Sequence, residues 1–293
     1  MKVVVSLSTV PSRVPYLQQI IDCLFGQTQQ VDRIYINLPY WSKREKRDYP
    51  LPSLRKDERI KVVRCQDHGP ITKLYPVLQE EKDPETLIIT VDDDIEYVPE
   101  RIKTLVDWAK KFPGAAIGGT GFIVGPWWAF YGTVHRPKVP TPVSVIEGFS
   151  GCAYRRGFFS NDLIDYTGAP PEAFYNDDVW ISGWLAQRGI PRLVHPSSSE
   201  FLVDQKLPGA LSANKIITAK KILPVIAHFY NQGLFREEQV VSPWATAGFW
   251  LLLLVLLLLI VVLVLILKFF PSPRVVVGLE PNLSSSYRSV GNF

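Results

Sequence analysis

The sequence predicts an α/β fold, with a mostly parallel sheet flanked by helices, followed by one C-terminal transmembrane helix. Over residues 1–235, short β-branched runs alternate with segments whose apolar residues recur at helical spacing. That alternation is typical of a Rossmann-like sheet, because each helix returns the chain to start the next strand in the same direction. Residues 249–267 then form one uninterrupted apolar run of transmembrane length.

Four strands and two helices are expected in the first part of the chain. Strands are predicted over residues 2–6, 33–37, 60–64 and 87–91, where β-branched residues cluster. The apolar residues of the first helix are Leu17, Ile20, Ile21, Leu24 and Phe25. The second helix follows Pro99 and ends at Pro113-Gly114. Its apolar residues are Ile102, Leu105, Val106, Ala109 and Phe112.

The rest of the first 235 residues is less regular. Residues 40–58 are expected to form a charged, proline-bounded loop, and a later helix is expected to end at Arg188-Gly189. After residue 120 the chain becomes rich in glycine, proline and aromatic residues. Loops of this composition on a rigid scaffold commonly shape a substrate pocket, and an irregularly packed half-domain would have the same composition.

The apolar run at 249–267 is expected to cross a membrane. Its 19 residues contain no charge, and at about 1.5 Å per residue they would span roughly 28 Å, the thickness of a bilayer core. Interface anchors flank it: Trp244, Trp250, Lys268, Phe269 and Phe270. The expected organisation is therefore a domain at 1–235, a juxtamembrane linker at 236–248, the helix, and a polar tail at 268–293.

Charge and cysteine content bear on location. The net charge of +4 is spread along the chain, and no basic, aromatic-interleaved patch suggests a nucleic-acid partner. The cysteines are Cys23, Cys65 and Cys152, an odd number without metal-type spacing. Because the first residues lack a signal-like apolar core, we expect the domain at 1–235 to be cytosolic, with a C-terminal single-pass anchor. The Lys and Arg residues of the tail favour the opposite, lumenal orientation.

Three consecutive carboxylates, Asp92, Asp93 and Asp94, come directly after the apolar strand at 87–91. In open α/β sheets, ligands bind outside the carboxyl ends of the strands. Adjacent acids repel one another unless a positive charge lies among them, and Mg²⁺ and Mn²⁺ prefer carboxylate and phosphate oxygens. The triplet therefore predicts a divalent-metal site, although an acidic turn before a helix would show the same pattern.

Four more segments join the acidic triplet in a recognisable order. They read SLSTVPSR at 6–13, DHGPITK at 67–73, EGFSGCAYRR at 147–156 and NDDVW at 176–180. Together with the DDD of 92–94, they resemble GT-A-fold, nucleotide-sugar-dependent glycosyltransferases. The likeness covers roughly residues 1–235. It is greatest to small family-2-like enzymes, including domains from large DNA viruses and their algal or protist hosts.

The resemblance implies a nucleoside-diphosphate sugar donor and a Mn²⁺ or Mg²⁺ cofactor. It implies that Asp94, with Asp92, ligates the metal, and that a late histidine, His228 or alternatively His195, completes that site. The remaining donor-binding residues would be Ser8, Thr9, Arg13, Asp67, Lys73, Asp92 and Asp93. Asp67 would meet the nucleobase, and Lys73 the phosphates or sugar.

On the acceptor side, the resemblance implies a loop of Gly148, Phe149, Ser150 and Gly151. Asp178 would be the general base, with Asp177 an equal competitor for that role. The acceptor would be a hydroxyl on a glycan, lipid or protein. The Q-x-x-R-W signature of processive synthases is missing, which favours transfer of a single sugar. UDP-sugars and inversion are the favoured expectations.

Two other classes of function fit parts of the pattern. A haloacid-dehalogenase-like phosphatase also places Asp at a strand end and uses Mg²⁺, but the position two after Asp94 is Glu96, which fits that motif poorly. A non-catalytic, membrane-tethered protein that binds carbohydrate or nucleotide is the second alternative.

Overall fold

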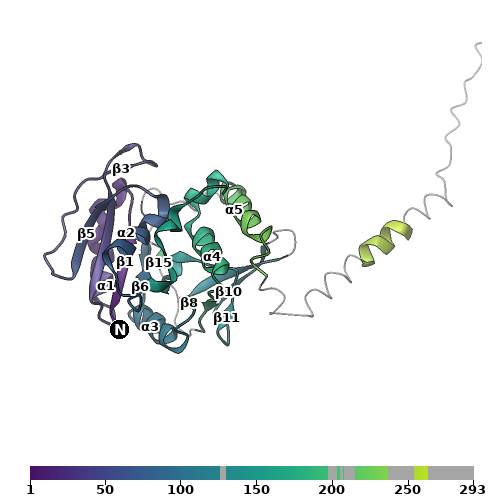
Figure 1. The fold of residues 1–293 in the computed structure, drawn as a ribbon, viewed down its shortest axis with the longest axis horizontal. Coiled ribbons are helices and arrows are strands. Elements are labelled where there is room, and N and C mark those ends of the chain that lie inside the picture. The colour runs from purple at the N-terminus through teal and green to yellow at the C-terminus, as the bar shows by residue number, and fades with distance from the viewer. Residues whose placement is uncertain (126–129, 197–202, 205–206, 208–214, 237–253, 263–293) are drawn as a thin grey trace, which may run out of the picture. The chain divides into compact units, whose positions relative to one another are not determined.

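The computed structural model describes residues 1–125, 130–196, 203–204, 207, 215–236 and 254–262 (Figure 1). The chain divides into two compact units, Met1–Val241 and Ser242–Phe293. The first unit contains the sheet and the candidate site.

An eight-stranded mixed sheet forms the centre of the first unit, in the order β11-β14-β8-β13-β6-β1-β2-β5 (Figure 1). Its strands are β1 Val3–Ser8, β2 Arg33–Pro39, β5 Ile60–Cys65, β6 Leu87–Thr90, β8 Ala116–Gly118, β11 Thr141–Pro142, β13 Cys152–Arg155 and β14 Arg192–Val194. Strands β6, β1, β2 and β5 are parallel neighbours, as are β8 and β14. Strand β13 runs antiparallel between β6 and β8, and β11 runs antiparallel to β14.

Helices cover both faces of this sheet. They are α1 Leu17–Phe25, α2 Tyr75–Glu80, α3 Arg101–Lys111, α4 Asp177–Gln187 and α5 Lys215–Tyr230. Alternate residues of β1 face opposite ways: Val3 and Val5 pack with α1 and α3, whereas Val4 packs with α2, α4 and α5. Burial on both faces explains why β1, β2 and β6 read as continuous apolar runs instead of alternating ones.

Smaller elements complete the first unit. A three-stranded sheet contains β9 Thr120–Val124, β10 Phe130–His135 and β12 Val145–Ile146, and two-stranded ribbons pair β3 Trp41–Ser42 with β4 Arg47–Asp48 and β7 Ile95–Glu96 with β15 Val203–Asp204. The 3₁₀ turns are η1 Pro11–Tyr16, η2 Gly69–Lys73, η4 Gly148–Ser150, η5 Arg156–Phe158, η6 Asn161–Ile164 and η7 Pro171–Tyr175.

Most of the expected elements are confirmed. Four predicted strands correspond to β1, β2, β5 and β6, and three predicted helices to α1, α3 and α4. Phe112, expected among the apolar residues on one face of α3, is the residue that caps the C-terminal end of this helix and is 36% exposed. Residues 40–58, expected to be a loop, include the β3–β4 hairpin.

The sheet is less parallel than expected. The chain passes from β12, in the three-stranded sheet, through η4 into β13, which runs antiparallel to both of its neighbours in the main sheet. The segment expected to be an acceptor loop is therefore also the entry to a central strand.

The second unit is described over residues 254–262, which are helical. Within the described part of the chain, no helix is long and apolar enough to cross a membrane. Residues 249–253 and 263–267 of the expected transmembrane segment, residues 237–248 of the linker and the whole tail at 268–293 lie outside the described residues.

Candidate functional site

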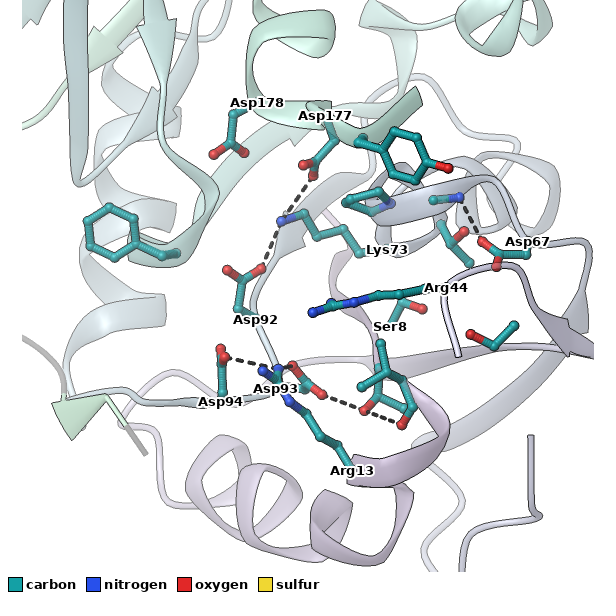
Figure 2. A pocket seen from close by; sticks show the side chains of 18 of the residues that line it. Ser8, Arg13, Arg44, Asp67, Lys73, Asp92, Asp93, Asp94, Asp177 and Asp178 are labelled. Carbon is teal, nitrogen blue, oxygen red and sulfur yellow. Dashed lines mark hydrogen bonds and ion pairs between the residues drawn. The ribbon is translucent and has the colours of Figure 1, made fainter. Parts of the chain in front are cut away.

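A cavity of about 610 Å³ opens at the carboxyl ends of β1, β5 and β6 (Figure 2). Turns η1 and η2, the acidic turn after β6, the tip of the β3–β4 hairpin and the start of α4 surround it. Eleven residues expected at a site line it: Ser8, Thr9, Arg13, Asp67, Lys73, Asp92, Asp93, Asp94, Phe149, Asp177 and Asp178. Segments from across the first 180 residues thus meet at one edge of the sheet. The carboxyl ends of its parallel strands lie at that edge.

The acidic turn is held by Arg13 of η1. The Arg13 Nη1 atom lies 2.7 Å from Asp93 Oδ1 and 2.9 Å from Asp94 Oδ2, and the Thr9 hydroxyl donates a hydrogen bond to Asp93. Burial raises the pKa of both Asp93 and Asp94, and the charge of Arg13 acts in the opposite direction. A side chain of the protein thus supplies part of the positive charge that the triplet requires.

Lys73, the last residue of η2, joins the acidic turn to helix α4. Its Nζ lies 2.8 Å from Asp92 Oδ1 and 3.1 Å from Asp177 Oδ2 (Figure 2). Burial acts to lower the pKa of Lys73, but the neighbouring carboxylates, including Asp178, raise it well above its ordinary value. The Ser6 hydroxyl donates to the Lys73 carbonyl at 2.6 Å, which fixes the backbone of η2 against β1. Lys73 is therefore a fixed, charged ammonium group.

Asp178 differs from its neighbour Asp177 in its contacts. Asp177 forms an ion pair with Lys73, whereas no ion pair within 4 Å joins Asp178 to any described residue. Burial and the charge of Asp177 raise the pKa of Asp178 well above its ordinary value, although the charge of Lys73 and a backbone hydrogen bond from Gly148 oppose this. A carboxylate with a raised pKa at a cavity wall is suited to accept a proton near neutral pH.

Asp67 organises the opposite end of the cavity through backbone contacts. Its Oδ2 accepts the Lys43 N–H at 2.7 Å, and its Oδ1 accepts the Gly69 N–H at 2.8 Å. Gly69 has φ +74°, and a Cβ there would lie 2.3 Å from the Phe174 carbonyl oxygen. The DHGP sequence thus needs glycine for both its backbone conformation and its close approach.

The four residues of the expected acceptor loop have different positions. The Phe149 side chain lines the cavity and is 38% exposed. Gly148 lies directly against the side chains of Asp178 and Lys73. A Cβ on it would come 2.7 Å from both Asp178 Oδ1 and Lys73 Nζ. Ser150 is fully buried and accepts the backbone N–H groups of Gly119 and Thr120, so it supports the fold. Neither Ser150 nor Gly151 lines the cavity.

His228, the histidine expected to complete the metal site, does not line the cavity that contains Asp92 and Asp94. It lies on α5, where its ring stacks on Trp180 at 6.1 Å and contacts Gln232. His195 is also elsewhere: it is buried beside Arg101, with 3.4 Å between Nε2 and Nη1. His135 of β10, which the sequence analysis did not select, is the histidine that lines the cavity.

The two acids expected to bind metal each have a carboxylate oxygen outside their ion pairs. In the described part of the chain, no group of three or more His, Cys, Asp or Glu residues is arranged to hold an ion unaided. Mg²⁺, however, is usually held by one or two carboxylates together with substrate phosphates. The Asp92 and Asp94 side chains are 28% and 20% exposed, and their ion pairs engage one oxygen of each. This donor set fits a metal that arrives with a phosphorylated ligand.

Several cavity residues were missed in the sequence. They include Ser42, Lys43, Arg44, Tyr49, Thr120, His135, Phe174 and Tyr175. Phe174 and Tyr175 immediately precede the NDDVW segment, so extending that segment by two residues would have included them. The hairpin residues gave no such signal, because a run of charged residues between prolines also fits an exposed loop.

Comparisons with known proteins give remote likenesses in structure. No family model and no curated protein matches the chain. The 2-C-methyl-D-erythritol 4-phosphate cytidylyltransferase of Francisella tularensis is similar with a TM-score of 0.42 and 12% identity, over 75% of this chain and 100% of that one. TarS of S. aureus is similar with a TM-score of 0.41 and 14% identity, over 70% of this chain and 60% of that one. A 4-diphosphocytidyl-2C-methyl-D-erythritol synthase is similar with a TM-score of 0.41 and 10% identity, over 76% of this chain and 99% of that one.

Proposed function

We propose that this chain is a metal-dependent glycosyltransferase. It would move one sugar from a nucleoside-diphosphate sugar, with UDP-sugars favoured, to a hydroxyl of a glycan, lipid or protein acceptor. The observation that carries the proposal is the cavity itself, in which the acidic turn, Lys73, Arg13 and the Asp177-Asp178 pair meet at the carboxyl edge of the sheet. Its volume of about 610 Å³ is in the range typical of small-molecule sites.

The charge balance of the cavity supports the need for a cation. Six carboxylates and four Lys or Arg side chains line it, so the wall is net negative by two charges when all are ionised. A nucleoside diphosphate adds further negative charge, which such a wall would repel. Asp92 and Asp94 would hold Mn²⁺ or Mg²⁺, which when bound supplies charge neutralisation for the leaving diphosphate.

The side chains of the cavity have complementary roles in this proposal. Arg13 and Lys73 keep the acidic turn and the start of α4 in register, and Asp67 and Thr9 border the donor site. Asp178 takes the proton from the acceptor hydroxyl. The acceptor oxygen then forms its bond to the anomeric carbon as the bond from that carbon to the diphosphate oxygen breaks. Attack from the side opposite the leaving group would invert the configuration.

The test is a donor screen on the full chain with Mn²⁺, in which release of nucleoside diphosphate is measured with and without acceptor sugars. Binding of UDP, GDP and their sugars, followed by thermal shift, identifies the base first. Turnover that is lost in EDTA and restored by Mn²⁺ is the expected result. Hydrolysis of simple phosphate esters without use of any nucleotide sugar would instead indicate a phosphatase. Nucleotide binding without turnover of any donor would indicate a non-catalytic binding protein.

A further inference from the structure

We propose that Arg44, at the tip of the β3–β4 hairpin, binds the phosphate groups of the donor, and that the hairpin is fixed in place to present it. This inference rests on the proposed function, because it assumes a donor that carries a diphosphate. The sequence alone placed Arg44 in a charged, proline-bounded loop and gave it no role.

Three contacts fasten the hairpin to the turns around the cavity. The Glu45 carboxylate accepts hydrogen bonds from the Ser12 N–H at 3.1 Å and the Ser12 hydroxyl at 2.5 Å. The Tyr49 hydroxyl donates to the Thr9 carbonyl at 2.9 Å. On the other side, the Lys43 N–H donates to Asp67 at 2.7 Å. The hairpin is thus tied to the segments that follow β1 and β5.

These contacts place the Arg44 side chain in the cavity. Arg44 is a lining residue, and Figure 2 shows its side chain reaching inward from the hairpin. Glu45 turns the other way, toward Ser12 and Arg47, where Arg47 Nη2 lies 2.6 Å from Glu45 Oε2. Glu45 therefore anchors the tip of the hairpin, and the adjacent Arg44 extends into the cavity.

Arg44 is a partly desolvated cation that interacts with a second cation, Arg13. Partial desolvation and the charge of Arg13 lower the pKa of Arg44, while Glu45 and Asp93 act to raise it. A guanidinium group does not lose its proton in practice, so Arg44 remains a partly desolvated cation that also interacts with the charge of Arg13. A phosphate oxygen near Arg44 would offset both effects.

Two of the other three cations of the cavity are held in ion pairs, and the third, Lys43, has its Nζ 4.5 Å from the centre of the Phe174 ring. Arg13 is 7% exposed at its side chain and bridges two carboxylates, and Lys73 is 10% exposed and also bridges two. Turning either toward a ligand would leave a carboxylate without its cation, which is costly in a buried site. Arg44 is exposed, and its planar fork matches two phosphate oxygens at once.

Inorganic pyrophosphate is the appropriate probe, because it carries the phosphate chemistry without a base or a sugar. Its affinity is measured by calorimetry at saturating Mn²⁺ for the full chain, for Arg44→Gln and for Lys46→Gln. Lys46 is the matched control, since it lies on the same hairpin and is exposed but does not line the cavity. Thermal unfolding of each variant is recorded in parallel, and Arg44→Lys tests whether charge without the fork is enough.

We expect Arg44→Gln to weaken pyrophosphate binding about 10- to 100-fold, the scale of one lost charge-assisted contact, and Lys46→Gln to leave it within about twofold. Equal affinity of Arg44→Gln and the unchanged protein would overturn the inference, and so would a variant that loses thermal stability without losing affinity. The proposed function can fail separately. If pyrophosphate binds through Arg44 but no nucleotide sugar is turned over, the anion site stands and the glycosyltransferase does not.

Discussion

At the scale of single residues, the cavity is defined by how its acids are paired. Asp93 and Asp94 share Arg13, and Asp92 and Asp177 share Lys73. Each pairing offsets a desolvation cost that a lone buried carboxylate would carry. Asp178 has no such ion pair in the described structure, and burial together with the charge of Asp177 raises its pKa well above the ordinary value.

Replacing Asp178 tests its role as the general base. We expect Asp178→Asn to fold and to bind donor, and to transfer sugar at least about 10²-fold more slowly, the scale of a lost general base. Steady-state kinetics and donor titration measure the two effects separately. Asp177→Asn is the neighbouring control, and because Asp177 pairs with Lys73 we expect it to lower stability and donor binding. If Asp177→Asn alone shows the pure rate defect, the base is Asp177.

The raised pKa of Asp178 also predicts a pH dependence. As a base it must be unprotonated, so kcat/KM should fall as the pH drops through the raised pKa. Below that pKa and above the ordinary carboxyl value, the folded protein keeps a proton that the unfolded chain has released, so stability falls as the pH rises. Across this pH range, the melting temperature of Asp178→Asn should therefore fall less steeply with rising pH than that of the unchanged protein. Equal slopes for both proteins would show that Asp178 has an ordinary pKa.

Asp94 is the residue that best separates metal binding from structure. Asp94→Ala leaves Arg13 paired with Asp93, so we expect a small change in thermal stability. Turnover and the enhancement of UDP binding by Mn²⁺ should both be lost, because one of two carboxylate ligands is missing. The measurement is UDP affinity with and without Mn²⁺ for both proteins. Full activity of Asp94→Ala in EDTA would contradict the metal site.

At the scale of elements, the turn η4 connects the cavity to the central strand β13. Tyr97 contributes to this link, because its hydroxyl accepts the Asp92 N–H at 2.9 Å and donates to the Phe149 carbonyl at 3.1 Å. The acidic turn and η4 are therefore held against each other by one buried side chain. Movement of either would displace the other.

A methyl group on η4 should disturb the charged cluster without disturbing the fold. In Gly148→Ala, the new Cβ would lie 2.7 Å from Lys73 Nζ and Asp178 Oδ1, both of them side-chain ends that can shift. We expect little loss of thermal stability but a rate loss of up to about 10²-fold, since small misplacement of reacting groups is costly. Gly114→Ala is the control, because nothing lies within 4 Å of its Cβ. Unchanged turnover of Gly148→Ala would argue against a catalytic role for this cluster.

The same elements show what the sequence can and cannot predict. Strands β1, β2 and β6 were predictable because burial on both faces makes them continuous apolar runs, and the acids were predictable because they end β6. Helix α2 was missed, since six residues with a proline near the start show no helical period. The antiparallel β13 and the β3–β4 hairpin depend on pairing between distant residues, which local patterns do not encode.

At the scale of the whole molecule, we propose that the chain is anchored by its second unit. Residues 254–262 are helical, and each of their nine apolar side chains is at least 47% exposed. Such a surface is unfavourable in water and favourable in lipid. The full chain should therefore stay in the membrane pellet after alkaline carbonate extraction. Leu257→Arg with Leu258→Arg should release it, because each charge costs about 2.5–3.5 kcal/mol at a helix centre. Leu257→Ala with Leu258→Ala, which keeps the segment apolar, should not.

We further propose that the first unit faces the cytosol. All three cysteines lie in described parts of that unit and are free, and Cys152 is fully buried, which suits a reducing compartment. The distribution of basic residues opposes this only weakly. Within about 20 residues of the apolar segment, the range over which the positive-inside rule applies, Lys268 and Arg274 follow it and Arg236 precedes it. Protease added to sealed vesicles should digest the first unit from outside. Its complete protection until detergent is added would place the first unit in the lumen, and the proposed donor would then have to be supplied on that side of the membrane.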